Sequence, residues 1–135
     1  MAQAIFNALA EDRNLPFRAE SAGTAALEGR PMAANAVAVL QEAGIHPDTH
    51  RARQVDEAMI EQAELVLAMS QRHASTLHRL CDNPSRKIYT LPDYAIGPHV
   101  EEGIPDPYGH TIAAYRSSVR QLSEYMGCAM DRLGR

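Results

Sequence analysis

The 135-residue sequence holds little of what marks secreted, membrane or metal-binding proteins. Its two cysteines, Cys81 and Cys128, are too few for a disulfide framework and too far apart for a metal-spaced pair, so we expect reduced thiols. The apolar run Leu65–Met69 is far too short to cross a bilayer. The acidic pair Glu11 and Asp12 in the first helical segment argues against a signal peptide. These absences predict a cytoplasmic protein that does not bind membranes.

An excess of basic residues is also lacking. Thirteen basic and 17 acidic side chains give a formal charge of −4, so we expect no nucleic-acid partner. Six histidines are present, but His73 and His78 are five residues apart and miss the spacing of ligands on one helix face. The sequence contains no glycine loop of the nucleotide-binding type. We expect no metal and no cofactor.

Apolar periodicity predicts alternating helices and strands within one domain, residues 1–135. The expected helices are Met1–Arg13, Ala33–Gly44, Asp56–Ala63, Ser70–Cys81 and Thr111–Leu133, and the expected strands are Phe17–Ala22, Leu65–Met69 and Lys87–Leu91. This alternation favours an α/β fold with a mostly parallel sheet, in which Leu65–Met69 is covered on both faces. The chain opens inside a helix. Either it starts there, as many proteins do, or a leading strand and loop are absent.

Five segments, in order, carry a resemblance to a known family. They are Met1–Phe6, Glu20–Thr24, Thr49–Gln54, Glu64–Met69 and Ile104–Gly109. Together they resemble the bacterial low-molecular-weight protein tyrosine phosphatases, in which the first segment is the helix after the phosphate loop. Gln3 is a departure, since the family usually has Glu there. The resemblance implies a flavodoxin-like, three-layer α/β/α fold with the first strand missing, so that the domain is N-terminally incomplete and Met1 is an internal methionine of the full protein.

The family's reaction uses a Cys-x5-Arg loop, which this sequence lacks. Cys81 and Arg86 have only four residues between them, and Cys128 has no arginine at the required spacing. Both cysteines fall near the C-terminal ends of expected helices, where the helix dipole disfavours a thiolate. We therefore expect that neither is a nucleophile and that the chain alone is inactive.

The resemblance assigns Asp106 as general acid and base, Tyr108 as a wall beside the substrate ring, and His50 and Ser21 as braces of the phosphate loop. Other interpretations stay open: Pro105–Gly109 as a simple turn, Tyr108 as an exposed loop residue and His50 as a surface histidine. We expect Asp106, Ser21 and His50 to converge near the start of the first helix. Phe17–Ala22 and Leu65–Met69, which would flank the missing strand, should either fail to pair or collapse together.

The implied function is hydrolysis of phosphotyrosine in a phosphorylated protein substrate, through a phosphocysteine intermediate and without a cofactor. Three alternatives remain: a non-catalytic binding or regulatory domain, a phosphoarginine phosphatase, and an arsenate reductase. The oligomeric state cannot be predicted from these features.

Overall fold

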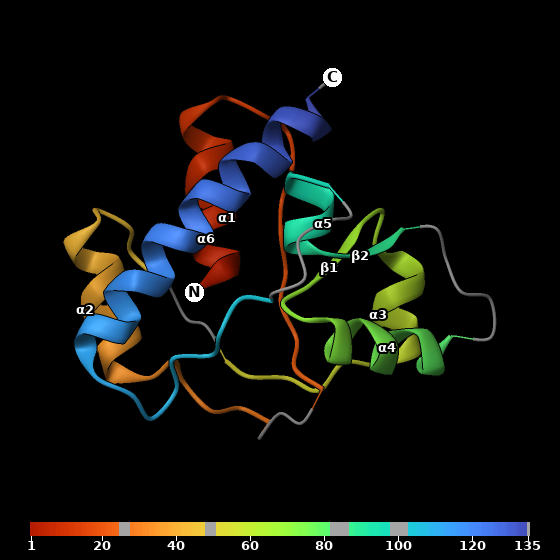
Figure 1. Cartoon of the computed structure of the whole chain (residues 1–135), viewed down its shortest axis with the longest axis horizontal. Helices are drawn as coiled ribbons and strands as arrows, with labels where there is room; N and C mark the ends of the chain where they lie inside the picture. Colours follow the sequence, from red (N-terminus) through yellow and green to blue (C-terminus); the bar gives the residue numbers. More distant parts are fainter. Residues whose placement is uncertain (25–27, 48–50, 82–86, 98–102, 135) are drawn as a thin grey trace.

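Two short parallel strands lie between helices in this protein (Figure 1). The computed structural model describes residues 1–24, 28–47, 51–81, 87–97 and 103–134. In chain order its elements are α1 (Ala2–Asp12), α2 (Ala34–Glu42), α3 (Glu57–Gln62), β1 (Val66–Ala68), α4 (Gln71–Leu80), β2 (Ile88–Thr90), α5 (Leu91–Ala95) and α6 (Ile112–Leu133).

The strands β1 and β2 separate two hydrophobic clusters. Their register pairs Val66 with Ile88 and Leu67 with Tyr89. Because side chains alternate along a strand, Val66 and Ile88 pack with α3 and α4, whereas Leu67 and Tyr89 pack with the cluster around α6. The sheet is therefore the middle layer of an α/β/α arrangement.

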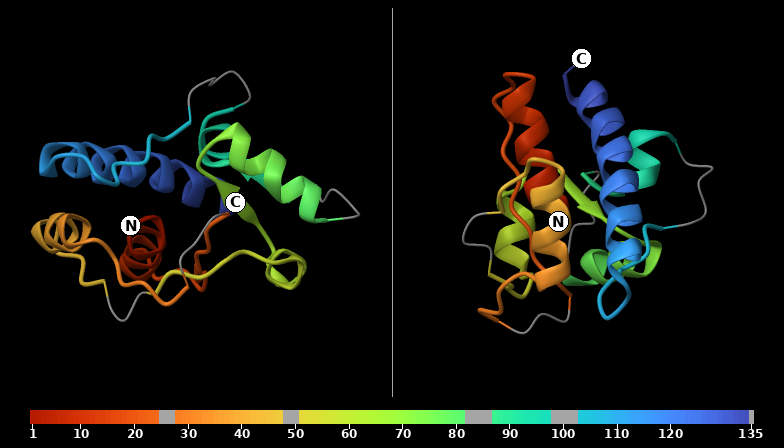
Figure 2. Two further views of the ribbon diagram at one scale, coloured as in Figure 1. Left: turned by 90° about the horizontal axis from the view of Figure 1, so that it is seen from below. Right: turned by 90° about the vertical axis from the view of Figure 1, so that its left-hand side faces the viewer.

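The larger cluster is built around α6, which α1, α2 and α5 contact. Figure 2 shows α1 and α6 running side by side. The expected helix Thr111–Leu133 is confirmed, and its central apolar residues Tyr115, Val119, Leu122, Met126 and Ala129 are all buried. Ile112 at its start is 36% exposed, because it lies in the first turn of the helix, at the edge of the cluster.

Side-chain caps mark where four helices begin and confirm the expected starts of α3, α4 and α6. Asp56, Ser70, Thr90 and Thr111 each accept a hydrogen bond from the backbone N–H three residues ahead, in α3, α4, α5 and α6. The expected strand Lys87–Leu91 ends where α5 begins, and α5 itself was not predicted from the sequence. Pro92 stands in the first turn of α5, where proline needs no N–H partner.

The strand expected at Phe17–Ala22 is wrong for the described residues, because this segment is extended but pairs with no strand. The side-chain amide of Asn7 replaces a strand partner: its Nδ2 donates to the Ala19 carbonyl at 3.1 Å, and its Oδ1 accepts from the Ala19 N–H at 2.7 Å. Just after the segment, Gly23 forms a bridge with Gln54. Of the two outcomes expected for the segment and β1, failure to pair is the one observed.

Full coverage of Leu65–Met69 is also wrong in detail. Ala68 is 5% exposed, whereas Val66 and Leu67 are only half-buried. Within the part of the chain that the structure describes, β1 has β2 as its only strand neighbour, so one edge of β1 has no strand beside it. Across the same described ranges, no helix is both long and apolar enough to cross a membrane.

Candidate active site

The loop that carries Asp106 is held against the carboxyl end of β1. The Ile104 N–H donates to the Met69 carbonyl at 2.8 Å, and the Ile104 side chain is buried in the larger cluster. Pro105 and Pro107 then restrict the backbone on both sides of Asp106. The Asp106 side chain is exposed, and its Oδ1 accepts a hydrogen bond from the Tyr108 N–H at 3.0 Å. The carboxylate is thus held by its own turn.

The carboxylate of Asp106 also affects the pKa of the Met1 amino group. Burial lowers the pKa of the Met1 amino group below its ordinary value, and the negative charge of Asp106 partly raises that pKa again. Met1 and Ile104, which precedes the Asp106 turn, pack in the same hydrophobic cluster, in agreement with this influence. The first N–H groups of a helix lack partners within the helix, and no side chain caps α1. This end of α1 therefore carries a partial positive charge that favours an anion.

Ser21 lies at the same end of α1. Its Oγ donates to Gln3 Oε1 at 2.6 Å, and its backbone carbonyl accepts from Arg53 Nε at 2.9 Å. Arg53 also forms an ion pair with Glu20 at 3.3 Å. Asp106 and Ser21 thus both lie by the first turn of α1, while His50 falls outside the described residues.

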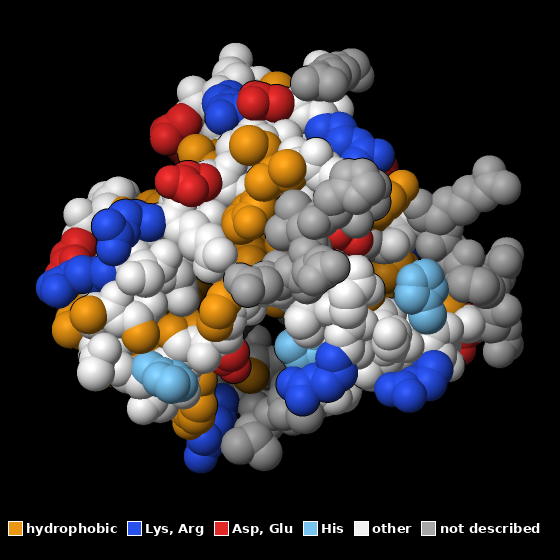
Figure 3. All heavy atoms as spheres, viewed as in Figure 1, with side chains coloured by type: hydrophobic (Ala, Val, Ile, Leu, Met, Phe, Trp, Pro, Cys, Tyr) orange, Lys and Arg blue, Asp and Glu red, His pale blue; other side chains and the backbone are white. Residues whose placement is uncertain are grey.

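Tyr108 is 66% exposed, and the structure links it to Asp106 through its backbone N–H. The surface is hollowed between the part formed by α2 and α6 and the part formed by α4, with acidic and histidine side chains at its rim (Figure 3). The segment before α6 crosses this region in Figure 1. Within the described ranges, no group of three or more His, Cys, Asp and Glu side chains could hold a metal ion.

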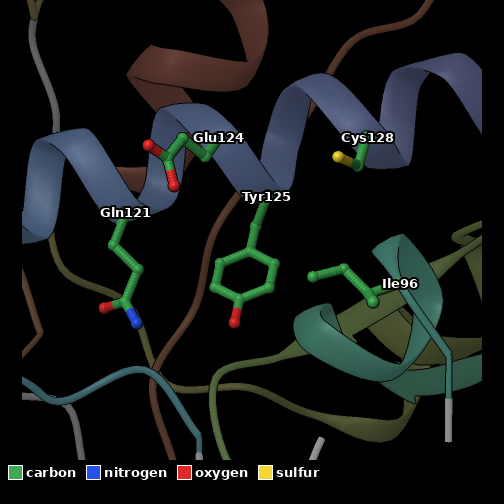
Figure 4. Close-up of a pocket in the computed structure, with 5 residues that line it drawn as sticks. All are labelled: Ile96, Gln121, Glu124, Tyr125 and Cys128. Atoms are coloured by element: carbon green, nitrogen blue, oxygen red, sulfur yellow. The ribbon is translucent and has the colours of Figure 1, made fainter.

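Cys128 lies at the opposite end of α1 from Asp106. Arg13, which follows α1, donates to the carbonyl of Gly127 at 3.4 Å and binds Asp131 at 2.8 Å. Since α1 is about 16 Å long, Cys128 is separated from the first turn of α1 by roughly that length. Cys128 instead lines a pocket of about 240 Å³ with Ile96, Gln121, Glu124 and Tyr125, which is smaller than most ligand sites (Figure 4).

Cys81 is equally remote. The Asp106 loop contacts Met69, just before the N-terminus of α4, whereas Cys81 is the C-terminal cap of α4. The intervening ten residues of α4 span about 15 Å. Cys81 packs beside the smaller hydrophobic cluster, as expected for a structural thiol.

The sequence reasoning gave no role to two residues that shape this site. Arg53 lies in the segment Thr49–Gln54, and its hydrogen bond to Ser21 joins two residues that are 32 positions apart in the sequence. Gly103 had no assigned role, although it lies in tight contact with Met69 and Ser70. No local pattern marks either contact, because both join segments that are distant in sequence.

Chemically, the arrangement combines an exposed carboxylate on a stiff loop with the positive end of a helix. A carboxyl in that place can give a proton to an oxygen and take one from water.

Comparison with known proteins identifies the family of this chain. The family described as low molecular weight phosphotyrosine protein phosphatase matches residues 1–135. A protein-arginine-phosphatase of Bacillus subtilis is 31% identical over 126 residues, covering 93% of this chain and 82% of that protein. A low molecular weight protein-tyrosine-phosphatase of Streptomyces coelicolor is 35% identical over 116 residues, covering 80% of this chain and 69% of that protein.

Solved structures show the same fold. The crystal structure of a low molecular weight protein tyrosine phosphatase from T. tengcongensis superimposes with a TM-score of 0.90 at 32% identity, covering 97% of this chain and 88% of that one. The expected flavodoxin-like α/β fold with a parallel sheet is thereby confirmed. The chain belongs to the low molecular weight phosphotyrosine protein phosphatase family.

Proposed function

We propose that this chain is the body of a protein phosphatase that hydrolyses phosphotyrosine side chains, with Asp106 as its general acid and base. The observation that carries the proposal is the place of Asp106, whose carboxylate is exposed on a stiff loop at the carboxyl end of β1 and acts on the start of α1. Ser21, tied to Gln3 in the first turn of α1, supports the same location as a brace of the phosphate site. Tyr108 and His50 keep their proposed roles beside the substrate ring and the phosphate loop.

The proposed reaction has two steps. A cysteine thiolate attacks phosphorus, the bond from phosphorus to the tyrosine oxygen breaks, and Asp106 gives its proton to that oxygen. Water then attacks the phosphocysteine while Asp106 takes a proton, so that inorganic phosphate and the thiolate are released. Cys81 ends α4 and Cys128 lies within α6 beside Arg13, so both are remote from Asp106. The proposal therefore takes the thiolate from a Cys-x5-Arg loop encoded outside these 135 residues.

Phosphoarginine is a second candidate substrate, because the Bacillus subtilis relative named as a protein-arginine-phosphatase matches 93% of this chain. A rival of another class is a phosphatase-like domain without the loop, which would bind or regulate rather than hydrolyse.

The test begins with the codons that lie in frame before Met1. If they encode Cys-x5-Arg, the chain extended by them should hydrolyse a phosphotyrosine peptide faster than a phosphoarginine peptide. In that extended protein, Asp106→Asn should lower turnover of the phosphotyrosine peptide about 10²–10⁴-fold, since general acid catalysis is worth that much. Asp12→Asn, an exposed change at the far end of α1, is the matched control and should leave turnover unchanged.

Full turnover in Asp106→Asn would remove the role of Asp106. A preference for phosphoarginine would select the second substrate, and an upstream sequence without the loop would select the non-catalytic domain.

A further inference from the structure

Gly103 makes the tightest approach among the described glycines. A Cβ atom added there would stand 2.6 Å from the Met69 carbonyl oxygen and 2.9 Å from the Ser70 Cβ. The Ser70 Cα would be only 3.0 Å away. None of these atoms is the end of a flexible side chain, so none can turn aside. Any side chain at position 103 must therefore push the loop and the end of β1 apart.

Gly103 lies close to Asp106 in the sequence. The next residue, Ile104, donates its N–H to Met69 and buries its side chain in the larger cluster. Pro105 follows with a fixed φ angle, and Pro107 restricts Asp106 from the other side. A displacement at Gly103 is therefore transmitted to Asp106 through a segment with little freedom to absorb it.

We propose that Gly103 is a positioning residue of the site, which sets the distance between Asp106 and the first turn of α1 by letting the loop lie directly against Met69 and Ser70. The inference rests on the proposed role of Asp106. An added methyl needs about 0.8 Å more room to reach ordinary van der Waals contact. A misplacement of about 1 Å can lower the rate of a reaction about 10²-fold. The contact at Gly103 therefore affects the rate of the reaction in which Asp106 takes part.

The amino group of Met1 reports the position of Asp106 without any turnover. Its pKa is raised by the Asp106 carboxylate, so the pKa should fall when that carboxylate is removed or moves away. We would titrate this amine by NMR in the 135-residue chain, with mass spectrometry confirming that Met1 is retained.

Four variants complete the experiment: Asp106→Asn, Gly103→Ala, the two combined, and Gly127→Ala. Asp106→Asn should lower the pKa of the Met1 amine, and Gly103→Ala should lower it in the same direction. The double variant should match Asp106→Asn alone, because a carboxylate that is absent cannot be misplaced. Gly127→Ala adds the same methyl on α6, where it meets only the flexible Arg13 side chain at 3.4 Å, and should leave the pKa unchanged.

Two results would overturn the proposal. One is a titration in which Asp106→Asn lowers the pKa of Met1 but Gly103→Ala leaves it at the wild-type value. The same holds if the pKa shift of the double variant is the sum of the shifts of the two single variants. The other is a Gly103→Ala chain that circular dichroism shows to be unfolded, since the glycine would then serve the whole fold. Because no turnover is measured, failure here is distinguishable from failure of the proposed function.

Discussion

The side chain of Asn7 binds the backbone of an extended segment that pairs with no described strand. Its amide offers one donor and one acceptor, and both are used by the backbone of Ala19. The segment that leads to Ser21 is thereby tied to α1, which brings Ser21 within reach of Gln3. A buried backbone N–H or C=O without a partner is costly, so this pair of hydrogen bonds stabilises an extended segment that no described strand covers.

Asn7→Ala should therefore lower the free energy of unfolding by about 1–3 kcal/mol, the usual cost of leaving partly buried polar groups unpaired. Urea unfolding of the 135-residue chain measures this value, and hydrogen exchange at the Ala19 amide should accelerate. Asn35→Ala, the same truncation at an exposed position of α2, is the control and should leave stability nearly unchanged. Equal effects of the two truncations would show that the Asn7 amide does not secure the segment.

At the scale of elements, helices α2 and α6 are joined by a two-point ion pair. Arg116 donates from Nε to Glu42 Oε2 at 3.0 Å and from its NH2 group to Glu42 Oε1 at 2.9 Å. The hydrogen bond from Arg116 lowers the pKa of Glu42 in the folded chain. Both residues are exposed, so salt should weaken the pair.

The lowered pKa predicts a pH dependence with a definite sign. The pair stabilises the fold fully above the unfolded pKa of Glu, about 4.3, and this contribution is lost as the pH falls through the lower folded pKa. Near neutral pH, the Tm of the wild type should be higher than the Tm of Glu42→Gln. This difference in Tm should vanish in acid. Glu124→Gln, the same change at an exposed position of α6, should not show this pattern. A Tm difference that persists unchanged into acid would contradict the assignment.

Helices were predictable to the extent that their signals are local. Thr111 and the apolar spacing that follows it locate α6, and Ser70 and Asp56 locate α4 and α3 in the same way. Strands depend on a partner elsewhere in the chain. Phe17–Ala22 was expected to be a strand, yet its backbone pairs with a side chain of α1, which no pattern within the segment could reveal.

The candidate site was predictable only through the resemblance. Composition alone cannot distinguish Asp106 from an ordinary turn aspartate, so its role rests on the resemblance of the motif around it and stays a prediction. The approach of Gly103 to Met69 depends on the packing of the loop against β1, so it needed the folded chain.

At the scale of the whole molecule, the Asp106 carboxylate is separated from the two thiols. Asp106 and Ser21 lie at the start of α1, while Cys128 lies beside Arg13 at its other end and Cys81 terminates α4. The layered fold itself enforces this separation, because α1 and α4 each interpose their length between the Asp106 loop and a thiol. The chain therefore has a carboxylate and a helix end suited to phosphate at one place, and its two thiols elsewhere.

The central claim is that these 135 residues form a phosphatase body in which neither cysteine is the nucleophile. Its most direct test is the turnover of an aryl phosphate by the 135-residue chain, measured for wild type, Cys81→Ser and Cys128→Ser. Loss of a nucleophile costs many orders of magnitude, and an acid alone cannot replace it. We predict no turnover above buffer in all three proteins. Clear turnover in the wild type that disappears in Cys81→Ser or Cys128→Ser would contradict the claim.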